Sequence, residues 1–364
     1  MRHGEAPSTS SGRVAPLDGV RAVAIVVVMA YHSGTSGLAT GGFYGQDAFF
    51  VLSGLLITSL LLQEGGRRRG IDLLAFWGRR IRRLLPALLV LLVAVDLYVT
   101  YVAPPGRYPG FTGDARSTVF YVANWHLISA SSNYFAVTGY PSLLTHTWSL
   151  AIEEQFYLVW PLVLLLVVWL LRGRPHRASL AVLAVSVAGA LASAGWMAYL
   201  YTEGASASRL YYGSDTHAQC LLVGAALAAG LRLAARRPHP GLFPTAHGRR
   251  RRWLLSAAGW AGAAGLCWLW THVSSASPFA YEGGFLCVAL CTAAVLVSVT
   301  AVPQGLLARG LGWRPIAFVG LISYGMYLWY FPTFALITSA HTGLRSWPLL
   351  AVRSLAVFAL AVVS

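Results

Sequence analysis

Long apolar stretches alternate with short polar segments along the whole chain. Each stretch holds about 17 to 25 residues, the length that an α-helix needs to cross a bilayer. They lie at 17–35, 46–63, 84–103, 148–171, 179–201, 217–235, 253–272, 283–303, 316–338 and 347–364. The pattern predicts an all-α fold, a polytopic helical bundle of about ten transmembrane helices.

The arginines predict how this bundle is oriented, because cytoplasmic loops of membrane proteins hold the excess of basic residues. With the N-terminus inside, 22 of the 27 basic residues, all of them arginine, fall on the cytoplasmic side. Arg107, Arg116, Arg209, Arg345 and Arg353 remain on or toward the outside. This orientation requires that the short and partly polar stretch 118–130 does not span.

The expected organisation follows from this orientation. Residues 1–16 are polar and lack a cleavable signal, so they form a cytoplasmic tail. Residues 17–364 form one transmembrane domain with a long outer segment at 104–147, and no C-terminal extracytoplasmic domain is expected. The aromatic residues of the outer segment suit either a membrane-interface belt or a sugar-stacking surface.

Composition supports a membrane protein. The chain is 57% hydrophobic and 11% charged, with a mean hydropathy of +0.61, whereas about 25% of residues are charged in soluble domains. The net charge of +15 would suggest nucleic acid in a soluble protein, but here the arginines flank apolar stretches and no nucleic-acid partner is expected. The four cysteines have no metal-binding spacing, so no metal is expected.

Arg21 and His32 lie in or at the edge of the first apolar stretch, eleven residues apart. That separation is roughly three helical turns, which places both side chains on one face about 16 Å apart. Ionisable groups at membrane depth usually face a bundle interior and carry function. The alternative is that Arg21 snorkels to the inner edge and His32 lies in the outer interface.

Three further segments carry candidate chemistry. Ser53 and Gly54 suit close helix packing, although Ser53 could be a nucleophile with His32 as its base, and Asp47 could orient that base. Arg80 and Arg83 are i,i+3 neighbours at the mouth of the third stretch. They suit either a positive-inside anchor or a pair of guanidiniums holding a phosphorylated cytosolic donor.

Two adjacent glutamates, Glu153 and Glu154, stand near the start of the fourth stretch. Acidic residues are favoured in a first helical turn by the helix dipole. However, adjacent helical residues point about 100° apart, so at least one of the two should face the protein interior. There it could pair with Arg21 or His32.

Four motifs, taken together, resemble the membrane-bound acyltransferase-3 family. They are Arg21-x10-His32, the segment Gln46 to Gly54, Arg80-x-x-Arg83-x-x-Pro86, and His146-Thr147-Trp148-Ser149-Leu150 running into Glu153 to Leu158. Their order and spacing match, and two later segments agree as well. His217 and Tyr330 depart from the family pattern, in which arginine and histidine respectively are common.

The resemblance implies a bacterial inner-membrane enzyme that acylates a hydroxyl of a carbohydrate or glycosylated acceptor. Acyl-CoA, expected to be acetyl-CoA, would be a co-substrate, with no bound cofactor. His32 would be the general base and Arg21 its partner, Arg80 and Arg83 would hold the CoA phosphates, and Glu153 with Glu154 would order the site.

A transporter or flippase of an acylated or polyprenyl-linked substrate is the alternative, since intramembrane charges can also line a pathway. Against it, the sequence shows no two-fold repeat of broken helices, and the ionisable residues concentrate in the first four stretches.

Overall fold

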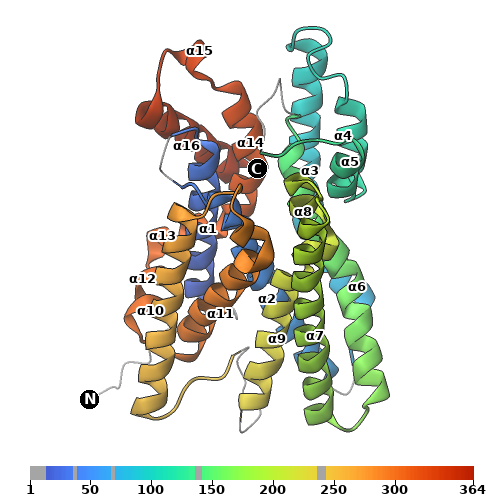
Figure 1. Ribbon diagram of the computed structural model, residues 1–364, viewed down its shortest axis with the longest axis vertical. Coiled ribbons are helices and arrows are strands. Elements are labelled where there is room, and N and C mark those ends of the chain that lie inside the picture. Colours follow the sequence, from blue (N-terminus) through green and yellow to red (C-terminus); the bar gives the residue numbers. More distant parts are fainter. Residues whose placement is uncertain (1–13, 36–38, 67–69, 136–141, 236–242) are drawn as a thin grey trace, which may run out of the picture.

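The computed structural model describes residues 14–35, 39–66, 70–135, 142–235 and 243–364 (Figure 1). Throughout these residues the regular secondary structure is helical, and they contain no strand. Eight of the described helices are long and apolar enough to cross a membrane. The prediction of an all-α polytopic bundle is therefore confirmed.

The long helices are α1 (Ala15–His32), α2 (Gly45–Gly65), α3 (Leu73–Tyr101), α6 (Trp148–Leu170), α7 (Pro175–Thr202), α9 (Ser214–Ala234), α10 (Arg249–His272), α11 (Phe285–Ala301) and α16 (Ser346–Val363). The shorter helices are α4 (Phe111–Val119), α5 (Ala123–Ser129), α8 (Ala207–Tyr212), α12 (Leu306–Leu311), α13 (Arg314–Leu321), α14 (Ser323–Leu336) and α15 (Ser339–Thr342). Single turns η1 (Gly42–Tyr44), η2 (Thr145–Thr147) and η3 (Ala280–Gly284) precede α2, α6 and α11.

Two of the ten predicted spans, 253–272 and 316–338, are not among the eight described helices that could cross a membrane. The helix α10 begins with four arginines, Arg249–Arg252, which lower the hydropathy of its first turn. The stretch 316–338 is not one continuous helix, because the chain turns at Ile322 between α13 and α14. Gly320, just before this turn, packs directly against the backbone of Asp18 in α1.

The outer segment 104–147 contains no membrane-spanning helix among its described residues. Its helices α4 and α5 have nine and seven residues, far fewer than the roughly 20 that a span requires. The expectation that 118–130 does not cross the membrane is thus confirmed. Residues 136–141 of this segment, like residues 1–13 of the predicted tail, lie outside the described residues.

The helix α3 begins well before its apolar stretch. Asp72 caps it, since its carboxylate accepts a hydrogen bond from the Ala75 amide at 2.9 Å. The predicted start at 84 was wrong because charged residues occupy the intervening turns. Arg80 and Arg83 therefore lie inside a formed helix rather than at its mouth.

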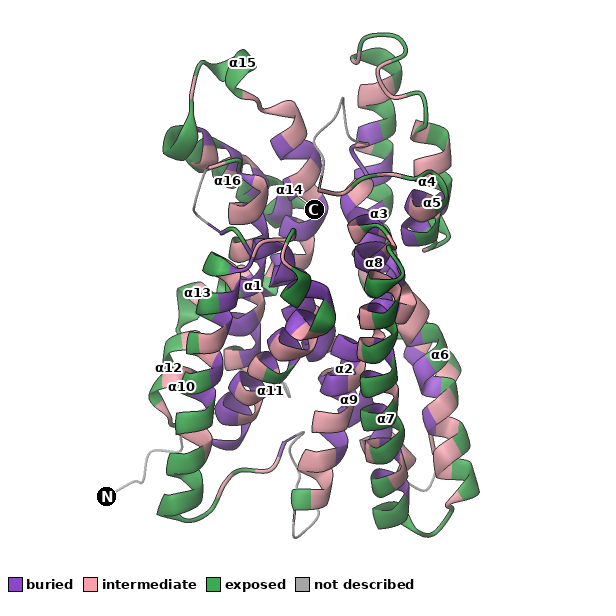
Figure 2. Cartoon of the chain, in the orientation of Figure 1, coloured by how far each residue is buried: buried purple, intermediate pink, exposed green. Residues whose placement is uncertain are grey.

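The helix α2 is the most enclosed of the spans, and it packs against α1, α6, α9 and α11. Figure 2 shows the buried residues gathered on the central helices, with exposed ones along α7 and α10. A Cβ on Gly54 would collide with the Leu221 carbonyl, and one on Gly224 with the Val51 carbonyl. These two glycines allow α2 and α9 to touch backbone to backbone.

Candidate active site

A cavity of about 420 Å³ lies between α1, α2, α3, α6, α13 and α14. Five of the six predicted site residues line it, namely Arg21, Arg80, Arg83, Glu153 and Glu154. They come from three helices and from positions more than 100 residues apart in the chain. The sixth predicted residue, His32, is not among the lining residues.

The cavity is long. Its α2 wall runs from Gln46 through Phe49, Ser53 and Leu56 to Leu60. These positions recur every three or four residues, so they form one face of the helix. From Gln46 to Leu60 the helix rises by about 21 Å, which is most of the thickness of a bilayer core.

Glu153 accepts hydrogen bonds from two hydroxyl groups, one on α2 and one on its own helix. Ser53 Oγ donates to Glu153 Oε1, and Tyr157 Oη donates to Glu153 Oε2, both at 3.1 Å. Ser53 is thus engaged with a carboxylate of α6, which leaves Gly54 as the packing residue of the pair. Arg21 forms an ion pair with Asp18 of its own helix at 3.3 Å, a partner that was not predicted.

Tyr157 also supports one of the predicted donor-binding arginines. The Arg80 guanidinium lies 3.5 Å from the centre of the Tyr157 ring, a cation–π contact that fixes its plane. Tyr157 therefore contacts both a basic residue, Arg80, and an acidic residue, Glu153, of the cavity lining. Tyr157 was not predicted as a site residue, although it stands in the motif that contains Glu153.

His32 lies at the last residue of α1, with its two ring nitrogens in different roles. Nδ1 is 2.9 Å from the Val28 carbonyl oxygen, which can only accept, so Nδ1 carries the proton. Nε2 is then the acceptor, and Tyr134 Oη donates to it at 3.0 Å. This tautomer places the lone pair on Nε2, where it accepts the Tyr134 hydrogen bond and could receive a proton once that bond is broken.

Tyr134 belongs to the outer segment and covers His32 from that side. Its burial raises the pKa of the phenol well above the usual value, so the hydroxyl stays protonated and acts as the donor to Nε2. Nothing in the local sequence distinguishes Tyr134 from its aromatic neighbours, because its partner is 102 residues away.

A layer of α14 side chains separates His32 from the cavity. Tyr330 contacts the His32 ring at a centroid distance of 5.3 Å and the Tyr327 ring at 5.4 Å. Tyr327 in turn lines the cavity, and its hydroxyl donates to the His146 carbonyl at 2.6 Å. The Tyr330 ring therefore contacts both the cavity-lining Tyr327 and the imidazole.

His217, the second residue that departs from the family pattern, does not line the cavity. His217 is 3.5 Å from Asp47 Oδ1, and both side chains are fully buried. Asp47 is therefore engaged with α9 and does not orient His32.

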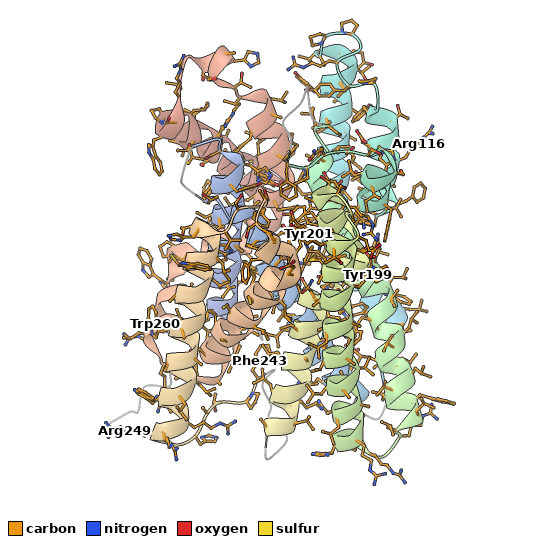
Figure 3. The ribbon with its side chains drawn as sticks, viewed as in Figure 1. Arg116, Tyr199, Tyr201, Phe243, Arg249 and Trp260 are labelled. Carbon is orange, nitrogen blue, oxygen red and sulfur yellow. The ribbon has the colours of Figure 1, made fainter. Side chains whose placement is uncertain are left out.

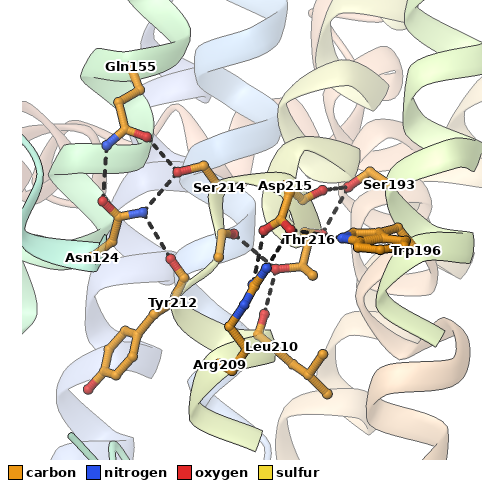
Figure 4. Close-up of polar contacts among 11 residues, drawn as sticks. Asn124, Gln155, Ser193, Trp196, Arg209, Leu210, Tyr212, Ser214, Asp215 and Thr216 are labelled. Carbon is orange, nitrogen blue, oxygen red and sulfur yellow. Dashed lines mark hydrogen bonds and ion pairs between the residues drawn. The ribbon is translucent and has the colours of Figure 1, made fainter. Parts of the chain in front are cut away.

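A polar network anchors the outer segment above α6 (Figure 4). Gln155 donates to Asn124 at 3.0 Å, Asn124 donates to Ser214 at 2.8 Å, and the Ser214 hydroxyl donates back to Gln155. Asn124 also donates to the Tyr212 carbonyl at 3.0 Å. The closed ring of bonds fixes α5 to α6 and α9, next to the turn of α6 that presents Glu153 and Glu154.

Comparison with known proteins bears on what this arrangement does. A family described as an acyltransferase domain, Acyl_transf_3, matches residues 14–364. The chain belongs to this acyltransferase family. The resemblance drawn from the four motifs is confirmed, and with it the prediction of an acyltransferase.

The chain is also similar to named bacterial proteins. It is 39% identical over 326 residues to the peptidoglycan O-acetyltransferase OatA of Listeria monocytogenes, covering 89% of this chain and 50% of that protein. It is 39% identical over 325 residues to the putative peptidoglycan O-acetyltransferase YrhL of Bacillus subtilis, covering 88% and 49%. The O-acetyltransferase OatA of Staphylococcus aureus is 37% identical over 323 residues, covering 89% and 51%.

The chain thus spans about half the length of the curated relatives it matches. No solved structure shows a significant match.

Proposed function

We propose that this chain moves an acetyl group from cytosolic acetyl-CoA, through the cavity, to a hydroxyl of peptidoglycan at the outer face of the membrane. The observation that carries the proposal is the continuous cavity wall on α2, which joins the level of Leu60 to that of Gln46. A donor arm laid along this wall would reach across most of the bilayer.

The cytoplasmic end of the cavity suits the donor. Arg80 and Arg83 are one turn apart on α3 and both line the cavity. Their guanidiniums can therefore donate bidentate hydrogen bonds to the phosphates of CoA. The stacking of Arg80 on Tyr157 sets its orientation before the donor arrives. The apolar side chains Leu56, Ile57 and Leu60 would line the path of the pantetheine arm.

His32 supplies the base at the opposite end. The acceptor oxygen would attack the thioester carbonyl carbon while Nε2 takes the hydroxyl proton. The carbon–sulfur bond then breaks, CoA leaves as the thiolate, and the thiolate and His32 exchange protons with solvent. Nδ1 keeps its bond to the Val28 carbonyl, so the ring does not need to rotate during the reaction.

The thioester must pass the Tyr330 ring to meet His32. A change of the Tyr330 rotamer would join the cavity at Tyr327 to the imidazole, because these rings lie in contact. In this proposal Tyr330 is the side chain that opens the path, while Glu153 and Ser53 keep the α2–α6 wall in place.

The membrane placement and the acceptor follow from the same argument. Arg249 lies at the lower end of the molecule and Arg116 in its upper part (Figure 3), and the arginine-rich end that contains Arg249 would face the cytoplasm. The chain would then be a multi-pass protein of the plasma membrane with a cytoplasmic N-terminus. Relatives named peptidoglycan O-acetyltransferases favour a glycan polymer over a glycosylated small molecule.

The proposal is tested by the release of CoA thiol from acetyl-CoA by membranes containing the protein, with and without peptidoglycan fragments. We expect release that depends on the acceptor, that is lost in His32→Ala and that needs higher donor concentrations in Arg83→Ala. Absence of release from folded, inserted protein with any acyl-CoA would overturn the proposal and favour transport.

A further inference from the structure

Arg353 of α16 is the sole buried arginine among the described residues, with 9% of its side chain exposed. A guanidinium at membrane depth is unfavourable unless backbone carbonyls or counter-charges satisfy it. From the sequence, Arg353 was predicted only to lie on or toward the outside of the membrane.

The guanidinium binds the ends of two other helices. Arg353 Nε donates to the Ile337 carbonyl at 2.7 Å, and Nη1 donates to the Ser33 carbonyl at 3.1 Å. Ser33 and Ile337 are the C-caps of α1 and α14, where carbonyl groups lack partners within the helix. The positive charge also complements the negative end of both helix dipoles.

Both helices carry groups of the proposed reaction centre. Ser33 directly follows His32, and Ile337 closes the helix that carries Tyr330 and Phe331, whose rings contact His32 at 5.3 and 5.7 Å. The Arg353 guanidinium further lies 5.1 Å from the Phe334 ring, which packs on Tyr330.

We propose that Arg353 is a positioning residue for acyl transfer: by clamping the C-terminal ends of α1 and α14 it fixes His32 Nε2 relative to the Tyr330 ring. The inference rests on the proposed role of His32. A lysine could not replace it fully, because an ammonium is a compact point charge that lacks the planar fork needed to reach two carbonyls in fixed directions.

The test compares Arg353→Gln and Arg353→Lys with Arg345→Gln, an exposed arginine on the chain segment just before α16. Misplacement of a catalytic group by about 1 Å can reduce rates by about a hundredfold. We therefore expect kcat to fall by about tenfold or more in Arg353→Gln and by less in Arg353→Lys. The KM for acetyl-CoA should stay within about twofold in both, because the arginines that would bind the donor lie toward the other end of the cavity. Arg345→Gln should have the same kcat and KM as the protein without substitutions.

A second readout does not depend on activity. Modification of His32 by diethyl pyrocarbonate, followed by mass spectrometry of its peptide, should be several-fold faster in Arg353→Gln, because the loosened α1 end exposes Nε2. An unchanged modification rate with unchanged kcat would overturn the inference. A parallel loss of kcat, donor affinity and thermal stability would also overturn it, since that pattern marks a role in folding only. If the unchanged protein transfers no acyl group, the proposed function fails, but the modification rates still decide whether Arg353 holds His32.

Discussion

The Tyr134 hydroxyl donates a hydrogen bond to Nε2 of His32 at 3.0 Å, the nitrogen that would take the proton in the proposed reaction. The two side chains come from the outer segment and from α1, and the phenol occupies the place that an acceptor hydroxyl would take. The resting site is therefore covered by a group with the same hydrogen-bonding chemistry as the substrate. In the proposed reaction an acceptor would have to displace Tyr134.

Replacing Tyr134 with phenylalanine tests this displacement. A hydrogen bond of this kind contributes about 0.5–1.5 kcal/mol, so Tyr134→Phe, which removes the bond that the acceptor must displace, should raise kcat/KM for the acceptor by up to about tenfold. Acetylated product formed at limiting acceptor measures this. A loss as complete as that of His32→Ala would show that the phenol itself takes part in the chemistry.

Tyr157 offers a pair of matched substitutions. Tyr157→Phe keeps the ring under Arg80 but removes the bond to Glu153, whereas Tyr157→Leu removes both. A cation–π contact is worth about 0.5–2 kcal/mol, so Tyr157→Leu should raise the KM for acetyl-CoA by about 2- to 30-fold. Tyr157→Phe should retain most donor affinity. Equal KM values in the two variants would argue against the stacked guanidinium as a donor ligand.

The size of the side chain at Tyr330 should control access to His32. In Tyr330→Trp the larger ring blocks the path from Tyr327, so we expect low kcat with donor binding preserved. Tyr330→Phe has nearly the same shape and should remain active. Isothermal titration of a non-hydrolysable acetyl-CoA analogue, beside turnover, separates the two effects. Full turnover in Tyr330→Trp would place the path elsewhere.

The packing of α2 on α9 is tested with two glycines. In Gly54→Ala the new methyl group meets the Leu221 carbonyl, and overpacking of this kind destabilises by about 1–3 kcal/mol. Gly230→Ala is the control, because a Cβ there meets no atom within 4 Å. The half-life in detergent at raised temperature should shorten only for Gly54→Ala. Equal half-lives would contradict the backbone contact.

The sequence predicted those features that depend on local patterns. Spans such as α6 and α16 were placed to within a residue or two, because a bilayer demands long apolar runs. Arg21 and Glu153 were found as charges in such runs, where charge is unfavourable without a partner, and Arg80 was found by its i,i+3 spacing from Arg83 just before such a run. The cavity brings them together, while their individual roles stay predictions.

Other features depend on contacts between distant residues. Tyr134 and Arg353 look like an interfacial aromatic and an outer charge until the fold places them beside His32 and Ser33. The early start of α3 was missed because hydropathy registers apolar length rather than helix length. The break at Ile322 lies two residues after Gly320, which packs closely against α1, and the apolar pattern of 316–338 does not reveal it.

The most direct test of the central claim is transfer across a bilayer. Sealed proteoliposomes with one protein orientation would receive labelled acetyl-CoA only on the side of Arg249, with peptidoglycan fragments only on the other side. We predict labelled acetyl esters on the fragments, absent with His32→Ala and present with Arg345→Gln. Ester formation only when donor and acceptor share one compartment would contradict a path through the cavity.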